Sequence, residues 1–144
     1  MTSNQTILIT GVTGKQGGAV ARALQGAGFN LRGLTRKPDS WPAAALAREA
    51  GVEHYVYTSV GSAHKGTGVP HFDNKWRIEE TVRGLRFPSH VILRPVFFME
   101  NLLVPFSLQG STLAWALGPA TKLQMIAVDD IGWFGARAFT MPPP

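Results

Sequence analysis

Three glycines occur at the spacing GxxGxxG in the stretch "ITGVTGKQGGAV", residues 9–20. An apolar run, "TILIT" at Thr6–Thr10, precedes them, and a helical pattern follows over Gln16–Gln25. A glycine turn between a strand and a helix lets a phosphate approach the unpaired N–H groups and the positive dipole end of the helix, because no Cβ blocks the way. The stretch therefore predicts a phosphate-binding corner of the dinucleotide type.

The residues at the end of the second predicted strand, Phe29–Arg36, indicate which dinucleotide would bind. A carboxylate at this position holds the ribose 2′-hydroxyl of NAD, whereas an arginine accommodates the 2′-phosphate of NADP. The chain has Thr35, Arg36 and Lys37 there, with no acid before Asp39. NADP is therefore favoured over NAD. The alternative is that Arg36 and Lys37 are solvated loop charges.

The amino-acid composition excludes or disfavours several other classes of protein. The 144 residues, with 44% hydrophobic content, predict one domain over residues 1–144. The absence of cysteine excludes a disulfide framework, and the four histidines lack metal-ligand spacing, so no metal is expected. With no leader and no apolar run of about 20 residues, we expect a cytoplasmic protein without a membrane partner. The net charge is +5, but the basic residues are spread along the chain, so a nucleic-acid partner is not favoured.

Strands and helices alternate along the chain. After the first strand, helix and strand, we expect helices at 43–50, 71–84 and 129–139 and strands at 53–61, 90–95 and 122–128. Asp129 or Asp130 can cap the last helix, a role that we favour over that of an acid in a site. The alternation predicts an α/β protein with a doubly wound, mostly parallel, Rossmann-like sheet.

Six stretches together resemble the NmrA-like family of atypical short-chain dehydrogenases/reductases. They are "ITGVTGKQGGAVARAL", "LTRKPDS", "AGVEHYVYTSVG", "GVPHFDNKWRIEE", "LRPVFFMENLL" and "MIAVDDIG", in the same order as in the family. The resemblance implies a Rossmann domain that binds NADP(H), with the phosphates on the turn from Gly11 to Gly17 and the 2′-phosphate near Arg36. It also implies that residues 98–101 lie along the nicotinamide half of the cofactor.

The resemblance therefore implies a set of cofactor-binding residues. They are Gly11, Val12, Thr13, Gly14, Lys15, Gln16, Gly17, Arg36, Lys75, Phe98, Met99, Glu100 and Asn101. For Phe97 and Phe98 the alternative is that they are core aromatics, and we expect this of one of them.

In ordinary short-chain dehydrogenases a serine, a tyrosine and a lysine carry the hydride chemistry. Read onto this chain, Ser59 and Lys75 stand at the serine and lysine positions, but His71 stands at the tyrosine position. His71 and Lys75 lie at i,i+4 on one predicted helix face. A histidine can act as a general acid near neutral pH. The alternatives are a polar helix-start residue for His71, a strand-end cap for Ser59 and an exposed helix lysine for Lys75.

The chain departs from the family pattern between Asp39 and Ala43. About two strand-helix units are absent there, judged by the roughly 30 residues of one unit, and so is the family's C-terminal extension after Pro144. Removing two strands from the Rossmann order leaves the order 2-1-3-4, which is flavodoxin-like and stable in other proteins. Closing the gap would shift Ser59 and Lys75 by about 4.8 Å, one strand spacing. Cofactor binding in the shortened form is therefore expected to be weak.

Three functions are compatible with these residues. The first is an NADP(H)-binding redox sensor or regulator that acts through cofactor occupancy, with a possible regulatory protein partner. The second is an NADPH-dependent reductase of quinones or small carbonyl compounds, in which His71, Lys75 or water manages the proton. The third is a degenerate chain that binds no cofactor and serves as an interaction protein.

Overall fold

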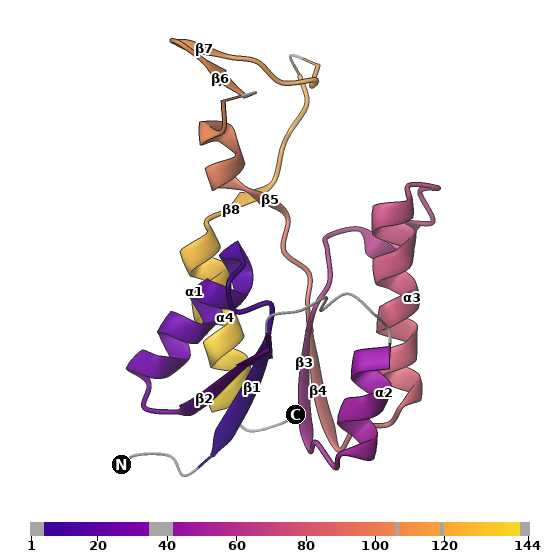
Figure 1. Cartoon of the computed structure of the whole chain (residues 1–144). Coiled ribbons are helices and arrows are strands. Elements are labelled where there is room, and N and C mark those ends of the chain that lie inside the picture. Colours follow the sequence, from indigo (N-terminus) through magenta and orange to yellow (C-terminus); the bar gives the residue numbers. More distant parts are fainter. Residues whose placement is uncertain (1–4, 35–41, 106, 119, 142–144) are drawn as a thin grey trace.

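A computed structural model describes residues 5–34, 42–105, 107–118 and 120–141 of the chain. Two pairs of parallel strands stand side by side, helices lie on both sides of them, and a thin extension leaves one end of the molecule (Figure 1). The mixed α/β class with parallel strands, expected from the sequence, is thereby confirmed.

The first strand pair consists of β1 (Thr6–Thr10) and β2 (Asn30–Leu34), joined through helix α1 (Lys15–Gly26). Ile7 and Ile9 point to one face and form a core with Leu24 of α1 and Ala136 of helix α4 (Val128–Thr140). Leu8 points to the other face and is 61% exposed. The sequence predicted a fully buried strand. That prediction is wrong for the Leu8 face, because α1 and α4 both pack on the opposite one.

The second strand pair consists of β3 (His54–Thr58) and β4 (Ser89–Leu93). Its helices are α2 (Pro42–Glu49) and α3 (Pro70–Gly84), and a short 3-10 helix, η1 (Ala63–Lys65), precedes α3. Ala44, Val82 and Phe87 are the buried members of this core, and Tyr55 of β3 stacks on Phe87 at 4.7 Å between ring centroids. The two strand pairs therefore have separate cores.

The two strand pairs lie in the spatial order β2-β1-β3-β4 (Figure 1), but β1 and β3 share no hydrogen-bonded ladder. The single sheet of order 2-1-3-4 is thus not formed among the described residues. Side chains make the connection instead: His54 of β3 donates from Nε2 to the carbonyl oxygen of Ala138 at 3.0 Å, and its ring packs edge-on against Phe139 at 5.4 Å. The first residue of β3 is therefore attached to α4.

Helices α1 and α4 run side by side in the same direction (Figure 1) and touch through small residues. A Cβ on Gly132 would lie 2.8 Å from the backbone of Ala19, and one on Gly135 would lie 2.5 Å from the side chain of Val20. Contacts below 3 Å force a shift of the neighbouring atoms. The glycines of α4 therefore fix how closely the two helices approach.

The remaining strands are short. β5 (Phe97–Phe98) pairs in parallel with β8 (Met125–Ile126), and between them lie η2 (Met99–Leu103) and the antiparallel pair β6 (Leu108–Gln109) and β7 (Thr112–Leu113). The strand expected over 122–128 is reduced to two residues, because β5 offers only two residues for pairing.

Asp129 and Asp130 do not cap α4, which corrects the prediction from the sequence. The helix begins at Val128, and Ala127 occupies the N-cap position. The side chain of Ala127 makes no capping hydrogen bond. Both aspartates therefore lie inside the first turn, where their charge complements the positive end of the helix dipole. The hydrogen bond to the first helical N–H comes from Glu100, whose Oε1 accepts from Val128 N at 2.8 Å.

We predict that Gly132→Ala lowers the free energy of unfolding by about 1–3 kcal/mol, as overpacking of a close contact does. The added methyl group would meet the carbonyl carbon and oxygen of Ala19, which belong to a helix backbone and cannot rotate away. Urea denaturation followed by circular dichroism measures the change.

Gly84→Ala is the matched control for this helix contact. Gly84 is the last residue of α3, and a Cβ there would meet no atom within 4 Å. This substitution should leave stability unchanged or raise it by up to about 1 kcal/mol through helix propensity. A Gly132→Ala variant as stable as Gly84→Ala would contradict the close approach of α1 and α4.

Candidate functional site

Local backbone geometry explains why two of the three positions in the glycine turn are occupied by glycine. Gly11 has a φ of +67°, a conformation that side chains with a Cβ disfavour. A Cβ on Gly17 would lie 2.3 Å from the carbonyl oxygen of Gly11, so this glycine allows α1 to start directly against the turn. Gly14 is the N-cap of α1, and a Cβ there would be only tight, at 3.3 Å from the same oxygen. Gly14 is thus the glycine that packing alone explains least.

An open groove of about 470 Å³ lies where α1 and α4 begin. Its lining residues come from the glycine turn, the two helices and η2: Thr13, Gly14, Lys15, Arg22, Glu100, Val128 and Asp129. Lys15 donates from Nζ to Asn101 Oδ1 at 3.4 Å, a contact between residues 86 positions apart in the sequence. The fold therefore brings Lys15, directly after the glycine turn, beside Asn101 and Glu100 of η2.

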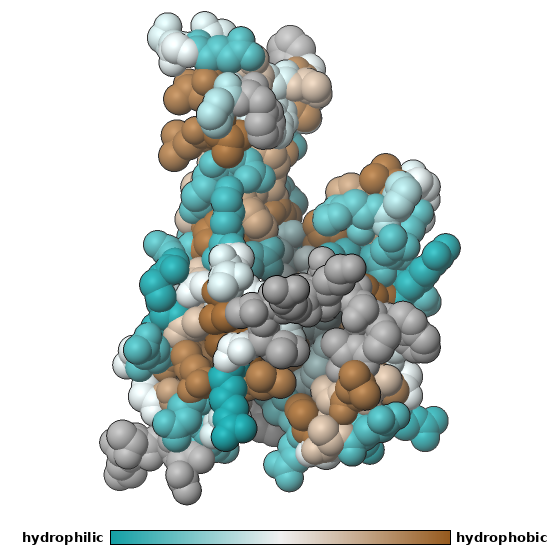
Figure 2. Space-filling view, in the orientation of Figure 1, coloured by the Kyte–Doolittle hydropathy of each residue, from teal (hydrophilic) through white to brown (hydrophobic). Residues whose placement is uncertain are grey.

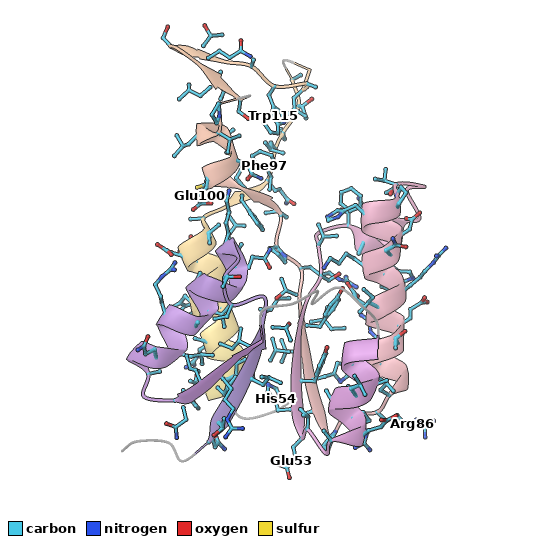
Figure 3. All side chains as sticks on the ribbon, in the orientation of Figure 1. Glu53, His54, Arg86, Phe97, Glu100 and Trp115 are labelled. Atoms are coloured by element: carbon cyan, nitrogen blue, oxygen red, sulfur yellow. The ribbon has the colours of Figure 1, made fainter. Side chains whose placement is uncertain are left out.

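Two helix N-termini meet at this groove, and they differ in charge. The N-terminus of α4 receives the carboxylate of Glu100, which lies between the base of the extension and the start of the helix (Figure 3). It also carries Asp129 and Asp130 in its first turn. The N-terminus of α1 has no side-chain cap and no acidic residue in its first turn. Its N–H groups and its positive dipole end are thus the part of the groove that is suited to an anion.

Two further charged residues reach the groove. Arg22 of α1 forms an ion pair with Asp129 of α4 at 3.1 Å, and both side chains are largely exposed, so the pair contributes about 0–1 kcal/mol to stability. The sequence analysis missed Arg22. Its position seven residues after Lys15, two helical turns along the same face of α1, was the signal that could have found it.

Glu100 has a second carboxylate oxygen with no hydrogen-bond partner. Oε1 bonds Val128 N, whereas Oε2 is shielded from solvent and unpaired among the described residues. A buried acceptor that is left unpaired costs free energy, so a ligand that donates a hydrogen bond to it would be favoured.

Of the cofactor-binding residues expected from the sequence, Thr13, Gly14, Lys15 and Glu100 line the groove, and the others that the structure describes do not. Val12, Gln16, Phe98 and Met99 belong to the turn, the first turn of α1, β5 and η2. Arg36 lies outside the described residues, so the structure does not place it. Lys75 is on α3, where Nζ donates to the carbonyl oxygen of Thr58 at 3.4 Å and lies 5.3 Å from the centre of the Tyr57 ring.

The three residues at the dehydrogenase positions are not brought together at the groove. His71 is exposed at the start of α3, with its ring edge-on to Phe72 at 5.5 Å. Ser59 is 4% exposed at the end of β3, and its N–H donates to Leu93 O at 2.7 Å. Neither these residues nor Lys75 lines the groove as the described residues define it.

Beside Ser59 lies a buried ion-pair network that the sequence analysis did not foresee. Glu79 of α3 is fully buried and accepts two hydrogen bonds from Arg94, at 2.9 and 2.6 Å, and one from Arg83 at 2.9 Å. Burial alone would raise the pKa of Glu79. The hydrogen bonds from Arg94 and Arg83 and the charge of Arg94 outweigh burial and lower this pKa to about 2. The network ties α3 to the end of β4.

The described residues fulfil neither a metal-site pattern nor a membrane-span pattern. They contain no cluster of three or more histidine, aspartate or glutamate side chains that could hold a metal ion. In the same part of the chain, none of the helices combines the length and the apolar character that crossing a membrane requires.

The fold and the glycine-turn groove define a Rossmann-like protein, and comparison with known proteins narrows the class. The sequence profile of the NmrA-like family matches residues 42–143. The chain belongs to the NmrA-like family. This match begins after the glycine turn, so the assignment does not depend on the common glycine motif.

Individual relatives support the same class. The chain is 38% identical over 78 residues to the NmrA-like family domain-containing protein 1 of Rattus norvegicus, a match that covers 54% of this chain and 51% of the rat protein. It is 50% identical over 52 residues to the NmrA-like family domain-containing oxidoreductase notA of an Aspergillus species, covering 35% and 15%. It is 30% identical over 93 residues to the mitochondrial protein FMP52 of Meyerozyma guilliermondii, covering 56% and 40%. The chain thus spans about half of the rat protein and less of the others.

We predict that stability falls in acid because Glu79 becomes protonated. Its folded pKa of about 2 lies below its ordinary value of 4.5, so its contribution is complete above about pH 4.5 and is lost as the pH falls toward 2. The shift corresponds to about 3 kcal/mol. Glu79→Gln should lower the free energy of unfolding by a similar amount at neutral pH and remove this part of the acid dependence. Urea denaturation at several pH values measures both effects.

Glu80→Gln is the control for this prediction, since Glu80 is the next residue of α3 and is exposed. Its replacement should change neither the stability at neutral pH nor the acid dependence. If both variants lost the same free energy, the buried network would not be the source of it.

Proposed function

We propose that this chain binds NADP(H) at the groove between α1, α4 and η2 and acts as a redox sensor or regulator through occupancy of that site. The observation that carries the proposal is the contact of Lys15 Nζ with Asn101 Oδ1. This contact brings two parts of the predicted site to one groove: the glycine turn, expected to hold the phosphates, and residues 98–101, expected along the nicotinamide half of the cofactor. Membership of the NmrA-like family supports a nicotinamide dinucleotide as the ligand.

The charges of the groove favour a phosphate at the start of α1. The helix has an uncapped N-terminus, Gly14 adds no side chain in front of it, and the Lys15 ammonium lies in the groove wall. Backbone N–H groups, a dipole end and a cation together are the elements that hold a pyrophosphate in dinucleotide sites. The N-terminus of α4, already neutralised by Glu100 and two aspartates, does not compete for it.

The other end of the groove offers hydrogen-bond acceptors. The unpaired Oε2 of Glu100 and the Oδ1 of Asn101 suit ribose hydroxyls or the amide of a nicotinamide. Bound NADPH would supply a hydride. The role of this chain's residues is to hold the phosphates at Lys15 and the polar groups at Glu100 and Asn101.

The arrangement favours a sensor over a reductase. Ser59 is buried beside the Glu79 network, the ring of His71 packs against Phe72, and Lys75 donates to the carbonyl oxygen of Thr58 in β3. No acid or base from the dehydrogenase positions therefore lines the groove as it is described. A protein that registers the cofactor needs only the binding site, which this groove can provide.

Calorimetric titration of the purified chain with NADPH tests the cofactor site. We expect a saturable binding signal that Lys15→Gln weakens about tenfold, the loss of roughly one charge-assisted hydrogen bond to phosphate. Lys65→Gln, which removes an exposed lysine of η1 away from the groove, is the matched control and should leave the affinity unchanged.

Two outcomes would count against this proposal. Absence of binding by a chain shown to be folded would remove the cofactor site and favour the degenerate interaction protein. Oxidation of NADPH in the presence of a quinone, lost in His71→Ala, would favour the reductase over the sensor.

We further predict a preference for NADPH over NADH that depends on Arg36. The basis is the sequence alone, since Arg36 ends the predicted second strand with no acid before Asp39. Arg36→Ala should weaken NADPH binding about tenfold and leave NADH binding unchanged, because only NADPH carries the 2′-phosphate. Arg77→Ala, at an exposed position of α3, controls for the loss of a positive charge. Equal loss for both nucleotides in Arg36→Ala would contradict the assignment.

A further inference from the structure

Arg22 lines the groove together with Lys15, but the proposed function gives it no role. It lies on α1 seven residues after Lys15, two helical turns along the same face. Its Nη2 donates to Oδ1 of Asp129 on α4 at 3.1 Å. Figure 2 shows mostly hydrophilic surface along the left edge of the molecule, where the upper parts of α1 and α4 lie. The groove therefore holds an arginine that is already paired with a carboxylate.

The guanidinium group of Arg22 points toward the start of α1. A Cβ on Gly18 would lie 3.5 Å from Nη1 of Arg22, so the guanidinium lies over Gly18, about one helical turn nearer to the glycine turn than its own Cα. Long side chains on a helix usually take this direction. Lys15 lies three residues before Gly18 on the same face of the helix. The guanidinium is therefore directed toward the uncapped N–H groups and the Lys15 ammonium.

The ion pair between Arg22 and Asp129 is weak enough for a phosphate to displace the carboxylate. The two side chains are 68% and 87% exposed, so water competes for both charges. An exposed ion pair changes an equilibrium by at most about fivefold, whereas a charge-assisted hydrogen bond to phosphate changes it by about tenfold or more. Asp129 also keeps a favourable position without Arg22, because it lies in the first turn of α4 near the positive end of the helix dipole. A phosphate at the start of α1 is therefore the stronger partner for Arg22.

We propose that Arg22 is a further phosphate-binding residue of this groove, and that Asp129 lowers the affinity for the dinucleotide by competing for Arg22. This inference rests on the proposed cofactor site. When the dinucleotide binds, the guanidinium leaves Asp129 and donates to a phosphate oxygen, and the carboxylate is left to solvent. A planar guanidinium can donate two parallel hydrogen bonds to a phosphate, whereas the ammonium of Lys15 acts as a point charge. The pyrophosphate is then held by two cations on one face of α1, and Asp129 sets how tightly it binds.

Calorimetric titration of the full chain with NADPH and with inorganic pyrophosphate tests the role of Arg22. We expect Arg22→Gln to weaken the binding of both ligands about tenfold, because pyrophosphate consists only of the groups that Arg22 binds. Arg77→Gln, at an exposed position of α3, is the matched control for the loss of a positive charge and should leave both affinities unchanged. Far-UV circular dichroism of each variant shows whether it is folded.

The same titrations of Asp129→Asn test the competition, which an ion pair with a merely structural role would not produce. We expect this variant to bind both ligands about threefold to fivefold more tightly, because Arg22 no longer has to leave a carboxylate. The gain should disappear when Arg22→Gln is present in the same chain. Asp130→Asn removes the same charge from the same turn of α4 at a residue that does not line the groove as described, so it measures the effect of charge alone and should give a smaller gain.

The outcomes separate this inference from the proposed function. Weaker binding in Arg22→Gln, together with a gain in Asp129→Asn that depends on Arg22, supports it. If Lys15→Gln weakens NADPH binding but Arg22→Gln does not, the cofactor site stands and the role of Arg22 is overturned. The inference is also overturned if Asp129→Asn gains no more than Asp130→Asn, or gains equally without Arg22. If the folded chain binds neither ligand, the proposed function itself fails, and this inference fails with it.

Discussion

The close approach of α1 and α4 determines the geometry of the candidate site. Gly132 presses against the backbone of Ala19 with no room for a Cβ, so the two helices lie as near to each other as their backbones allow. Both helices run in the same direction, and their N-termini therefore open into the same groove. If the helices were farther apart, Glu100 and the glycine turn would no longer line one groove.

Glu100 makes the N-termini of α1 and α4 different from each other, although both open into the same groove. Its carboxylate caps α4 and, with Asp129 and Asp130, neutralises that helix end, whereas the end of α1 stays uncapped. The start of α1 is therefore the more electropositive of the two helix ends at the groove. The family resemblance predicts that Glu100 lies along a cofactor, and the tertiary structure shows that the same side chain accepts a hydrogen bond at the start of a helix 28 residues later in the sequence.

Local patterns predicted the elements well because they depend on neighbours in the sequence. The strand at Thr6–Thr10 was found with its exact bounds, and the helix expected at 71–84 was found at Pro70–Gly84. Prediction was weaker where an element depends on a distant partner. The strand expected over 122–128 kept two residues, which pair with the two residues of β5, and β1 and β3 share no hydrogen-bonded ladder. The Glu79 network also escaped detection, since its arginines become partners only when α3 meets β4.

The sequence by itself determined the family, the α/β class, the glycine turn and the order of the elements. Each of these features depends on the types of residues that lie close together in the sequence, such as the glycines that a tight turn requires. Only the tertiary structure decided that Lys15 meets Asn101, that Glu100 and not an aspartate caps α4, and that Ser59 is buried beside an ion pair. These contacts join residues from 15 to 86 positions apart. They follow from how helices and strands pack, which no local pattern contains.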